Sequence, residues 1–147
     1  MMINNHQNFM KIAIDEANLS GQDVPVGAVL VIDDIVIAKS SNKREEFNKP
    51  SAHAEMIVID EAAQKMETWR LNEAKLYVTL EPCPMCAALI LQSKIKEVYF
   101  GAYDTNYGAF GSKMDMQKII NSKILIKGGI MEEECQKLLL EFFKGKR

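Results

Sequence analysis

The sequence contains few of the cysteines from which disulfide-rich proteins are built. Of its 147 residues three are cysteine, and two of these, Cys83 and Cys86, lie three positions apart. An odd number of cysteines with one such short pair suits a reducing compartment and a bound metal better than disulfides. The third, Cys135, lies in an amphipathic stretch near the C-terminus, where we expect it to be a buried small apolar residue.

Long hydrophobic runs are also missing. No apolar stretch approaches the ~20 residues that a membrane-spanning helix needs. Residues 1–8 lack the basic and then apolar pattern of a signal peptide. We therefore expect a cytoplasmic protein that does not enter the membrane.

An excess of positive charge is absent as well. The net charge is −2 and the sequence pI is about 5.7, whereas proteins that bind phosphate backbones usually show a basic surface. Any nucleic-acid site on this chain must therefore be local. The candidate segments are residues 39–49, which include Lys43 and Arg44, and the tail at residues 142–147.

The remaining composition is that of an ordinary globular protein. Hydrophobic residues make up 48% of the chain and charged residues 26%, close to the average for soluble domains. A chain of this length buries about two thirds of the surface that it exposes when unfolded. We expect a single domain over residues 1–147.

The segment from Cys83 to Cys86 carries the clearest chemical signal. It leads directly into the apolar run 87–91, which places both sulfurs on one face of the first turn of a helix. The partial positive charge of a helix N-terminus lowers thiol pKa values and favours the thiolates that zinc needs. Pro84 fits this turn, because the first backbone N–H groups of a helix have no helical partner.

His53 is the natural third ligand, because the other histidine, His6, lies in a polar N-terminal segment. A closed site of four ligands is hard to assemble from this composition, whereas three protein ligands with an open position are typical of catalytic zinc. Glu55 follows two residues after His53. A carboxylate there can lie near the open position without binding the metal, as a general acid/base requires.

The pattern of apolar residues predicts an α/β fold. It indicates helices at residues 9–19, 53–66, 113–120 and 131–143 and after Cys83, and strands at residues 24–32, 35–38, 75–80, 97–100 and 124–126. Strand 75–80, the cysteine pair with its helix, and strand 97–100 form a βαβ unit, so the two strands should be parallel. Ligands of such sheets bind beyond the carboxyl ends of the strands, where the cysteine pair lies. Pro25 and Gly27 indicate a sheet edge, a bulge or a close approach of the backbone to a ligand.

The combination H-x-E…P-C-x-x-C is the signature of zinc nucleobase deaminases. Over nearly its whole length the sequence resembles the bacterial tRNA-specific adenosine deaminases (TadA type) of the cytidine deaminase superfamily. The blocks that carry the resemblance are residues 24–29, Asn42, residues 52–55, residues 70–71, residues 76–83, Met85 and Cys86, residues 100–102, Asp104, residues 111–112 and residues 142–143.

The resemblance implies a three-layer α/β/α fold of the cytidine deaminase type with a central mixed five-stranded sheet. It further implies a homodimer that converts adenosine to inosine at the wobble position, position 34, of a tRNA anticodon. One Zn²⁺ per subunit would be bound by His53, Cys83 and Cys86, and Glu55 would transfer protons. The residues implied to contact the anticodon stem-loop are Asn42, Asp104, Phe143 and Arg147.

Three other functions remain open on the sequence alone. The same zinc site could deaminate a free nucleobase or nucleoside of guanine, cytosine or adenosine type. The chain could also be a non-catalytic partner subunit stabilised by zinc, but a purely structural metal has no use for Glu55. A redox role for the Cys-x-x-Cys pair is disfavoured because His53 accompanies the cysteines.

Overall fold

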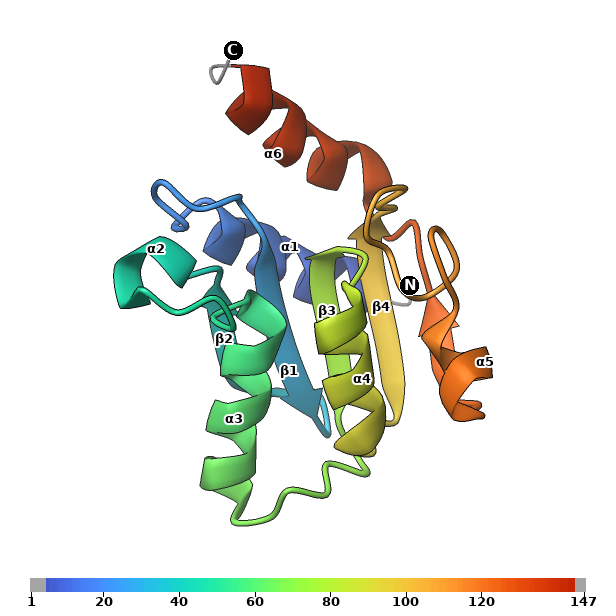
Figure 1. Cartoon of the computed structure of the whole chain (residues 1–147). Coiled ribbons are helices and arrows are strands. Elements are labelled where there is room, and N and C mark those ends of the chain that lie inside the picture. Colours follow the sequence, from blue (N-terminus) through green and yellow to red (C-terminus); the bar gives the residue numbers. More distant parts are fainter. Residues whose placement is uncertain (1–4, 145–147) are drawn as a thin grey trace.

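The computed structural model of the chain describes residues 5–144 (Figure 1). At its centre lies a five-stranded mixed sheet with the strand order β2-β1-β3-β4-β5. Its elements are, in chain order, α1 (Asn5–Ala17), β1 (Gly27–Ile32), β2 (Ile35–Ser41), α2 (Arg44–Phe47), α3 (Ala54–Met66), β3 (Lys75–Leu80), α4 (Pro84–Gln92), β4 (Glu97–Ala102), α5 (Met116–Ile120), β5 (Leu125–Lys127) and α6 (Glu132–Lys144).

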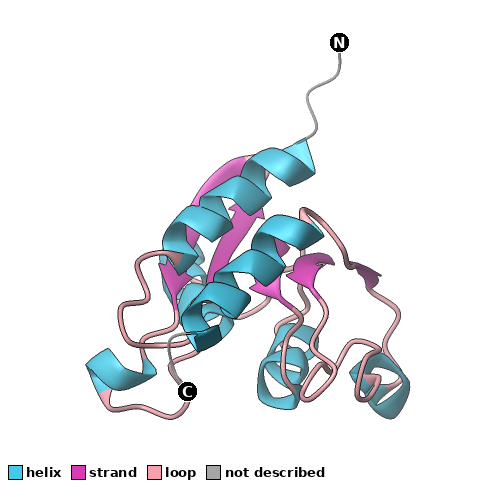
Figure 2. Cartoon of the chain, turned by 90° about the horizontal axis from the view of Figure 1, so that it is seen from above, coloured by secondary structure: helices cyan, strands magenta, loops and turns pink. Residues whose placement is uncertain are grey.

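Helices cover both faces of the sheet, so the predicted three-layer α/β/α architecture is confirmed (Figures 1 and 2). Successive side chains of a strand point to opposite faces. In β1, Ala28 and Leu30 join the apolar core under α3 and α4. Val29 and Val31 join the second core, under α1 and α6. The inner strand β1 is therefore almost continuously apolar, as a strand buried on both faces must be.

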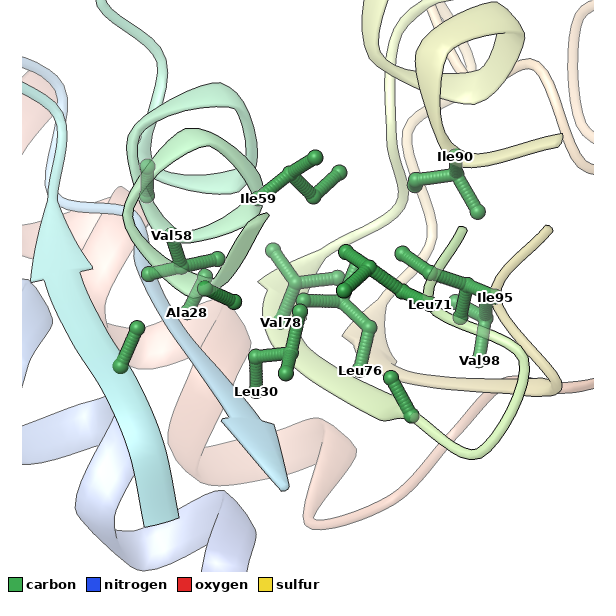
Figure 3. Packing of buried hydrophobic residues seen from close by; sticks show 14 of the residues in the cluster. Ala28, Leu30, Val58, Ile59, Leu71, Leu76, Val78, Ile90, Ile95 and Val98 are labelled. Carbon is green, nitrogen blue, oxygen red and sulfur yellow. The ribbon is translucent and has the colours of Figure 1, made fainter. Parts of the chain in front are cut away.

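The core under α3 and α4 fixes the position of these two helices. Val58 and Ile59 of α3 and Ile90 of α4 belong to one buried cluster with Leu76 and Val78 of β3 (Figure 3). Each such fully buried aliphatic side chain stabilises the fold by about 1.5–3 kcal/mol relative to an exposed one. Both helices also begin at the same end of the sheet (Figure 1), so their N-termini lie near each other.

Strands β3 and β4 pair in parallel, as the βαβ pattern predicts. The strands predicted at residues 24–32 and 35–38 form a hairpin, since β1 and β2 pair antiparallel with Ile32 opposite Ile35. Asp33 and Asp34 form the two-residue turn with φ of 52° and 61°. Such left-handed conformations match the twist of the flanking strands. Strand β2 continues to Ser41, beyond the predicted end at residue 38, because its pairing with β1 extends to Gly27.

Gly27 marks a close approach of its backbone to helix α1. A Cβ atom at this position would lie within 3.0 Å of the backbone of Ala13 and Ala17 in α1. Helix α1 therefore crosses β1 at a distance that only glycine permits. β1 lies inside the sheet and its bulge falls between Leu30 and Val31, so the prediction of an edge at Gly27 is wrong.

Two helices begin several residues away from their predicted starts. Helix α1 starts at Asn5 instead of residue 9, because His6 hydrogen-bonds Tyr77 and stacks on Tyr99. Helix α5 starts at Met116 instead of residue 113, since the side chain of Asp115 accepts a hydrogen bond from the Gln117 N–H and caps the helix there. Over residues 5–144, no helix has the length and apolar character needed to cross a membrane.

Candidate metal centre

The predicted metal ligands lie at the N-termini of two neighbouring helices. His53 is the N-cap residue of α3 and Cys83 is the N-cap residue of α4, both with extended backbone. Pro84 occupies the start of α4 and Cys86 its first turn. Cys83 follows β3 by three residues. The site therefore lies beyond the carboxyl end of this strand, where the sequence predicts it.

The three ligand atoms have the separations of a tetrahedral zinc site. His53 Nδ1 lies 3.6 Å from Cys83 Sγ and 3.4 Å from Cys86 Sγ, and the three donors lie within 4.8 Å of one another. Zn–N bonds of about 2.0–2.1 Å and Zn–S bonds of about 2.3 Å at tetrahedral angles require N···S separations of about 3.5 Å. The donors therefore fit zinc, and within residues 5–144 they form the one cluster of this kind.

Hydrogen bonds among the ligands prepare one thiolate. The pKa of Cys83 falls to about 4, first because the Cys86 thiol donates a hydrogen bond to it and then because of His53. The same hydrogen bond raises the pKa of Cys86, and a hydrogen bond with Cys83 raises the pKa of His53. Cys83 is thus the more acidic of the two thiols, and both cysteines bind a metal as thiolates.

Glu55 lies in the first turn of α3 and is 4% exposed. Burial raises its pKa to about 7, and the charge of His53 and a hydrogen bond with Cys86 act in the opposite direction. The carboxyl group is therefore in contact with the ligand cluster without being one of the three clustered donors. A carboxyl group that gains and loses a proton near neutral pH is suited to acid/base chemistry.

Asn42 lies beside the metal ligands and connects three segments. Its Oδ1 accepts a hydrogen bond from the Ala54 N–H at 2.9 Å, and its Nδ2 donates one to the Val24 carbonyl at 3.1 Å. The side chain thus ties the N-terminus of α3 to the end of β2 and to the segment before β1. The structure brings Asn42 next to His53, but it also uses both ends of the amide for the fold.

Two of the other residues implied to contact substrate are not part of this cluster. Asp104 follows β4, and its Oδ1 accepts hydrogen bonds from the N–H groups of Asn106 and Tyr107. Phe143 is 52% exposed and stands near the end of α6, which packs on the other face of the sheet. Arg147 lies outside the described residues. Their contacts with substrate remain predictions.

Two further residues near the site have environments that the sequence alone did not show. Arg44, noted above only for its charge, lies close enough to lower the pKa of His53. Glu81, two residues before Cys83, is 2% exposed although it is a carboxylate. The available signal for Glu81 was its charge, which interrupts an otherwise apolar approach from β3 to the cysteine pair.

Comparison with known proteins agrees with this geometry. Residues 3–102 match the family described as the cytidine and deoxycytidylate deaminase zinc-binding region. The tRNA-specific adenosine deaminase of Bacillus subtilis is 46% identical over 140 residues, which cover 92% of this chain and 87% of that protein.

Solved structures give the same grouping. A structure from work on A-to-I editing by tRNA:A34 deaminases at the wobble position of transfer RNA superposes with a TM-score of 0.83 and 40% identity, covering 90% of this chain and 99% of that one. Guanine deaminase from Bacillus subtilis has a TM-score of 0.66 and 34% identity, covering 79% of this chain and 74% of that one. The chain belongs to the zinc-binding cytidine and deoxycytidylate deaminase family.

Proposed function

We propose that this protein is a zinc-dependent tRNA adenosine deaminase that converts the wobble adenosine, position 34, to inosine. The observation that carries the proposal is the cluster of His53, Cys83 and Cys86 with the buried carboxyl group of Glu55 against it. The choice of a tRNA substrate rests on the 46% identity to a tRNA-specific adenosine deaminase over most of both chains. A cytoplasmic homodimer is part of the same proposal.

The reaction consumes one water molecule and releases ammonia. Zinc, when bound by the three ligands, supplies hydroxide near neutral pH because it lowers the pKa of water to about 7. With zinc held by His53, Cys83 and Cys86, Glu55 would accept a proton from the attacking water and deliver it to the ring nitrogen of adenine, while the water oxygen adds to the carbon that bears the amino group. Glu55 would then pass the remaining hydroxyl proton to the amino group, which would leave as ammonia, with inosine as the other product.

The substrate must present its base outside a stack. Unstacking costs a few kcal/mol in a duplex and less in an anticodon loop, where the bases are already open. We assign the nucleoside contact to Asn42 and the contacts with flanking nucleotides to Asp104, Phe143 and Arg147. With a net charge of −2, we expect few phosphate contacts and a shallow dependence of binding on salt.

The test measures inosine formation in an anticodon stem-loop against ammonia release from free bases and nucleosides. We expect the stem-loop to be edited and the same stem-loop with guanosine at the wobble position to be inert. The 34% identity to a guanine deaminase favours guanine as the second candidate substrate. Faster turnover of free guanine than of the stem-loop would overturn the proposal in favour of that candidate.

The contribution of the C-terminal tail to RNA binding can be tested separately. Removal of residues 145–147, which lie outside the described part of the chain, should weaken stem-loop binding and editing and leave the zinc content unchanged. Sedimentation velocity at micromolar concentration reports whether the protein is the proposed homodimer.

A further inference from the structure

The carboxylate of Glu81 is a buried acceptor for one loop. Its Oε1 accepts hydrogen bonds from the Asp104 N–H at 3.1 Å and from the Ser112 hydroxyl, and its Oε2 accepts from the N–H groups of Phe110 and Ser112, each at 3.1 Å. All four donors belong to residues 103–112, here called the 103–112 loop. A single side chain thus holds both ends of this loop.

Backbone contacts place the same loop beside the metal ligands. The Ala109 N–H donates to the carbonyl of Pro82 at 2.9 Å, and Pro82 immediately precedes Cys83. Gly108 packs so closely that a Cβ atom there would overlap the Glu81 carboxylate. The 103–112 loop therefore lies against Glu81 and Pro82, which precede the metal ligand Cys83.

The four donors explain how a carboxylate can be buried at this position. A charged group taken out of water must regain its interactions from the protein. Among residues 5–144 no basic side chain forms an ion pair with Glu81 within 4.0 Å, so the compensation comes from N–H and O–H groups of the loop. Hydrogen bonds to an ionised acceptor are about twice as strong as those between neutral groups.

We propose that Glu81 is a positioning residue that holds the 103–112 loop against the metal centre and thereby sets the affinity for substrate. The loop carries Asp104, assigned above to RNA, and the exposed rings of Tyr103 and Tyr107. Glu81 acts through this loop and not on the reacting atoms. The inference on affinity rests on the proposed function, whereas the inference on the loop does not.

The first experiment measures the loop itself. In zinc-loaded Glu81→Gln, the new NH₂ group faces N–H donors, so the amides of Asp104, Phe110 and Ser112 should exchange hydrogen at least about tenfold faster than in the wild type. Exchange in α4 and the zinc content should not change. Glu97→Gln is the matched control, because Glu97 stands at the opposite end of β4 and pairs with Lys75.

The second experiment measures KM and kcat for the anticodon stem-loop. Glu81→Gln should raise KM about tenfold or more and change kcat less than about twofold. Glu81→Asp keeps the charge at a shorter reach and should recover part of the loss. Ser112→Ala removes one of the four hydrogen bonds and should raise KM about fivefold, which decides the matter if Glu81→Gln does not fold.

Each result has a definite meaning. Wild-type exchange rates in the loop of Glu81→Gln, or wild-type KM in the Glu81→Gln and Ser112→Ala variants, overturn the proposal. So does a fall in kcat at constant KM, because the loop would then serve the chemical step. If the wild type edits no stem-loop, the proposed function fails, and the exchange experiment still decides whether Glu81 holds the loop.

Discussion

His53 Nδ1 lies 3.4 Å from Cys86 Sγ, although 33 positions separate the two residues in the sequence. The contact exists because α3 and α4 pack on one face of the sheet and both begin at the same end of it (Figure 1). Each helix contributes ligands from its N-terminus, where the first N–H groups and the helix dipole favour negative charge. The metal centre therefore depends on how these two helices pack.

Removal of one ligand should abolish zinc binding. His53→Ala and Cys86→Ala leave two protein donors, so each variant should purify with far less than one zinc per chain, as measured by elemental analysis. Cys135→Ala is the matched control, because Cys135 is 1% exposed in the other core and is not one of the clustered donors. The ligand assignment is wrong if His53→Ala or Cys86→Ala retains stoichiometric zinc.

The acid/base role of Glu55 predicts a separation of binding from turnover. Glu55→Gln keeps the shape of the side chain and removes its titrating group, so the variant should fold, keep zinc and lose turnover by about 10²–10⁴-fold. The measurements are single-turnover inosine formation and zinc content on the same preparation. Near wild-type activity in the metal-loaded variant would rule out the role.

Asn42 should contribute to stability apart from any contact with substrate. Asn42→Ala removes the acceptor for the Ala54 N–H and the donor to the Val24 carbonyl. Leaving such buried groups without partners should lower the free energy of unfolding by about 1–3 kcal/mol, as measured by urea denaturation of the zinc-loaded protein. Asn18→Ala, whose hydrogen bond is exposed, should change stability by less than about 0.5 kcal/mol. Equal effects of the two substitutions would contradict the structure.

His6 should make stability depend on pH. Its Nδ1 lies 2.7 Å from the Tyr77 hydroxyl, and burial, followed by the charge of Lys75, lowers its pKa below the ordinary value of 6.5, with Glu97 acting in the opposite direction. The folded state therefore disfavours the protonated ring. In the window between the lowered pKa and 6.5 the unfolded chain binds more protons, so this contribution is present above 6.5 and is lost as the pH falls.

His6→Gln gives the matched comparison, because glutamine forms hydrogen bonds but does not titrate. The free energy of unfolding of the wild type, minus that of His6→Gln, should fall as the pH is lowered from about 7.5 to about 5. Both proteins share the metal ligands, whose protonation cancels in the difference. A difference that stays constant over this range would refute the coupling.

The sequence by itself determined the types and spacings of the functional residues. Two cysteines three positions apart at the start of an apolar run define a helix N-terminus with paired sulfurs, and this follows from the 3.6-residue repeat of a helix. The pattern of apolar residues likewise predicted the five strands, and the βαβ order predicted the parallel pairing of β3 with β4, whereas the three-layer architecture was implied by the family resemblance. These features depend on local geometry, which neighbouring residues control.

Only the tertiary structure decided which distant groups share an environment. Gly27 is required by the backbone of α1, Asn42 joins the start of α3 to the segment before β1, and Glu81 gathers donors from residues 104–112. A buried polar group must find partners wherever the packing of the core brings them. Since that packing is set by contacts between residues far apart in the chain, local pattern shows that such groups exist but not which partners they have.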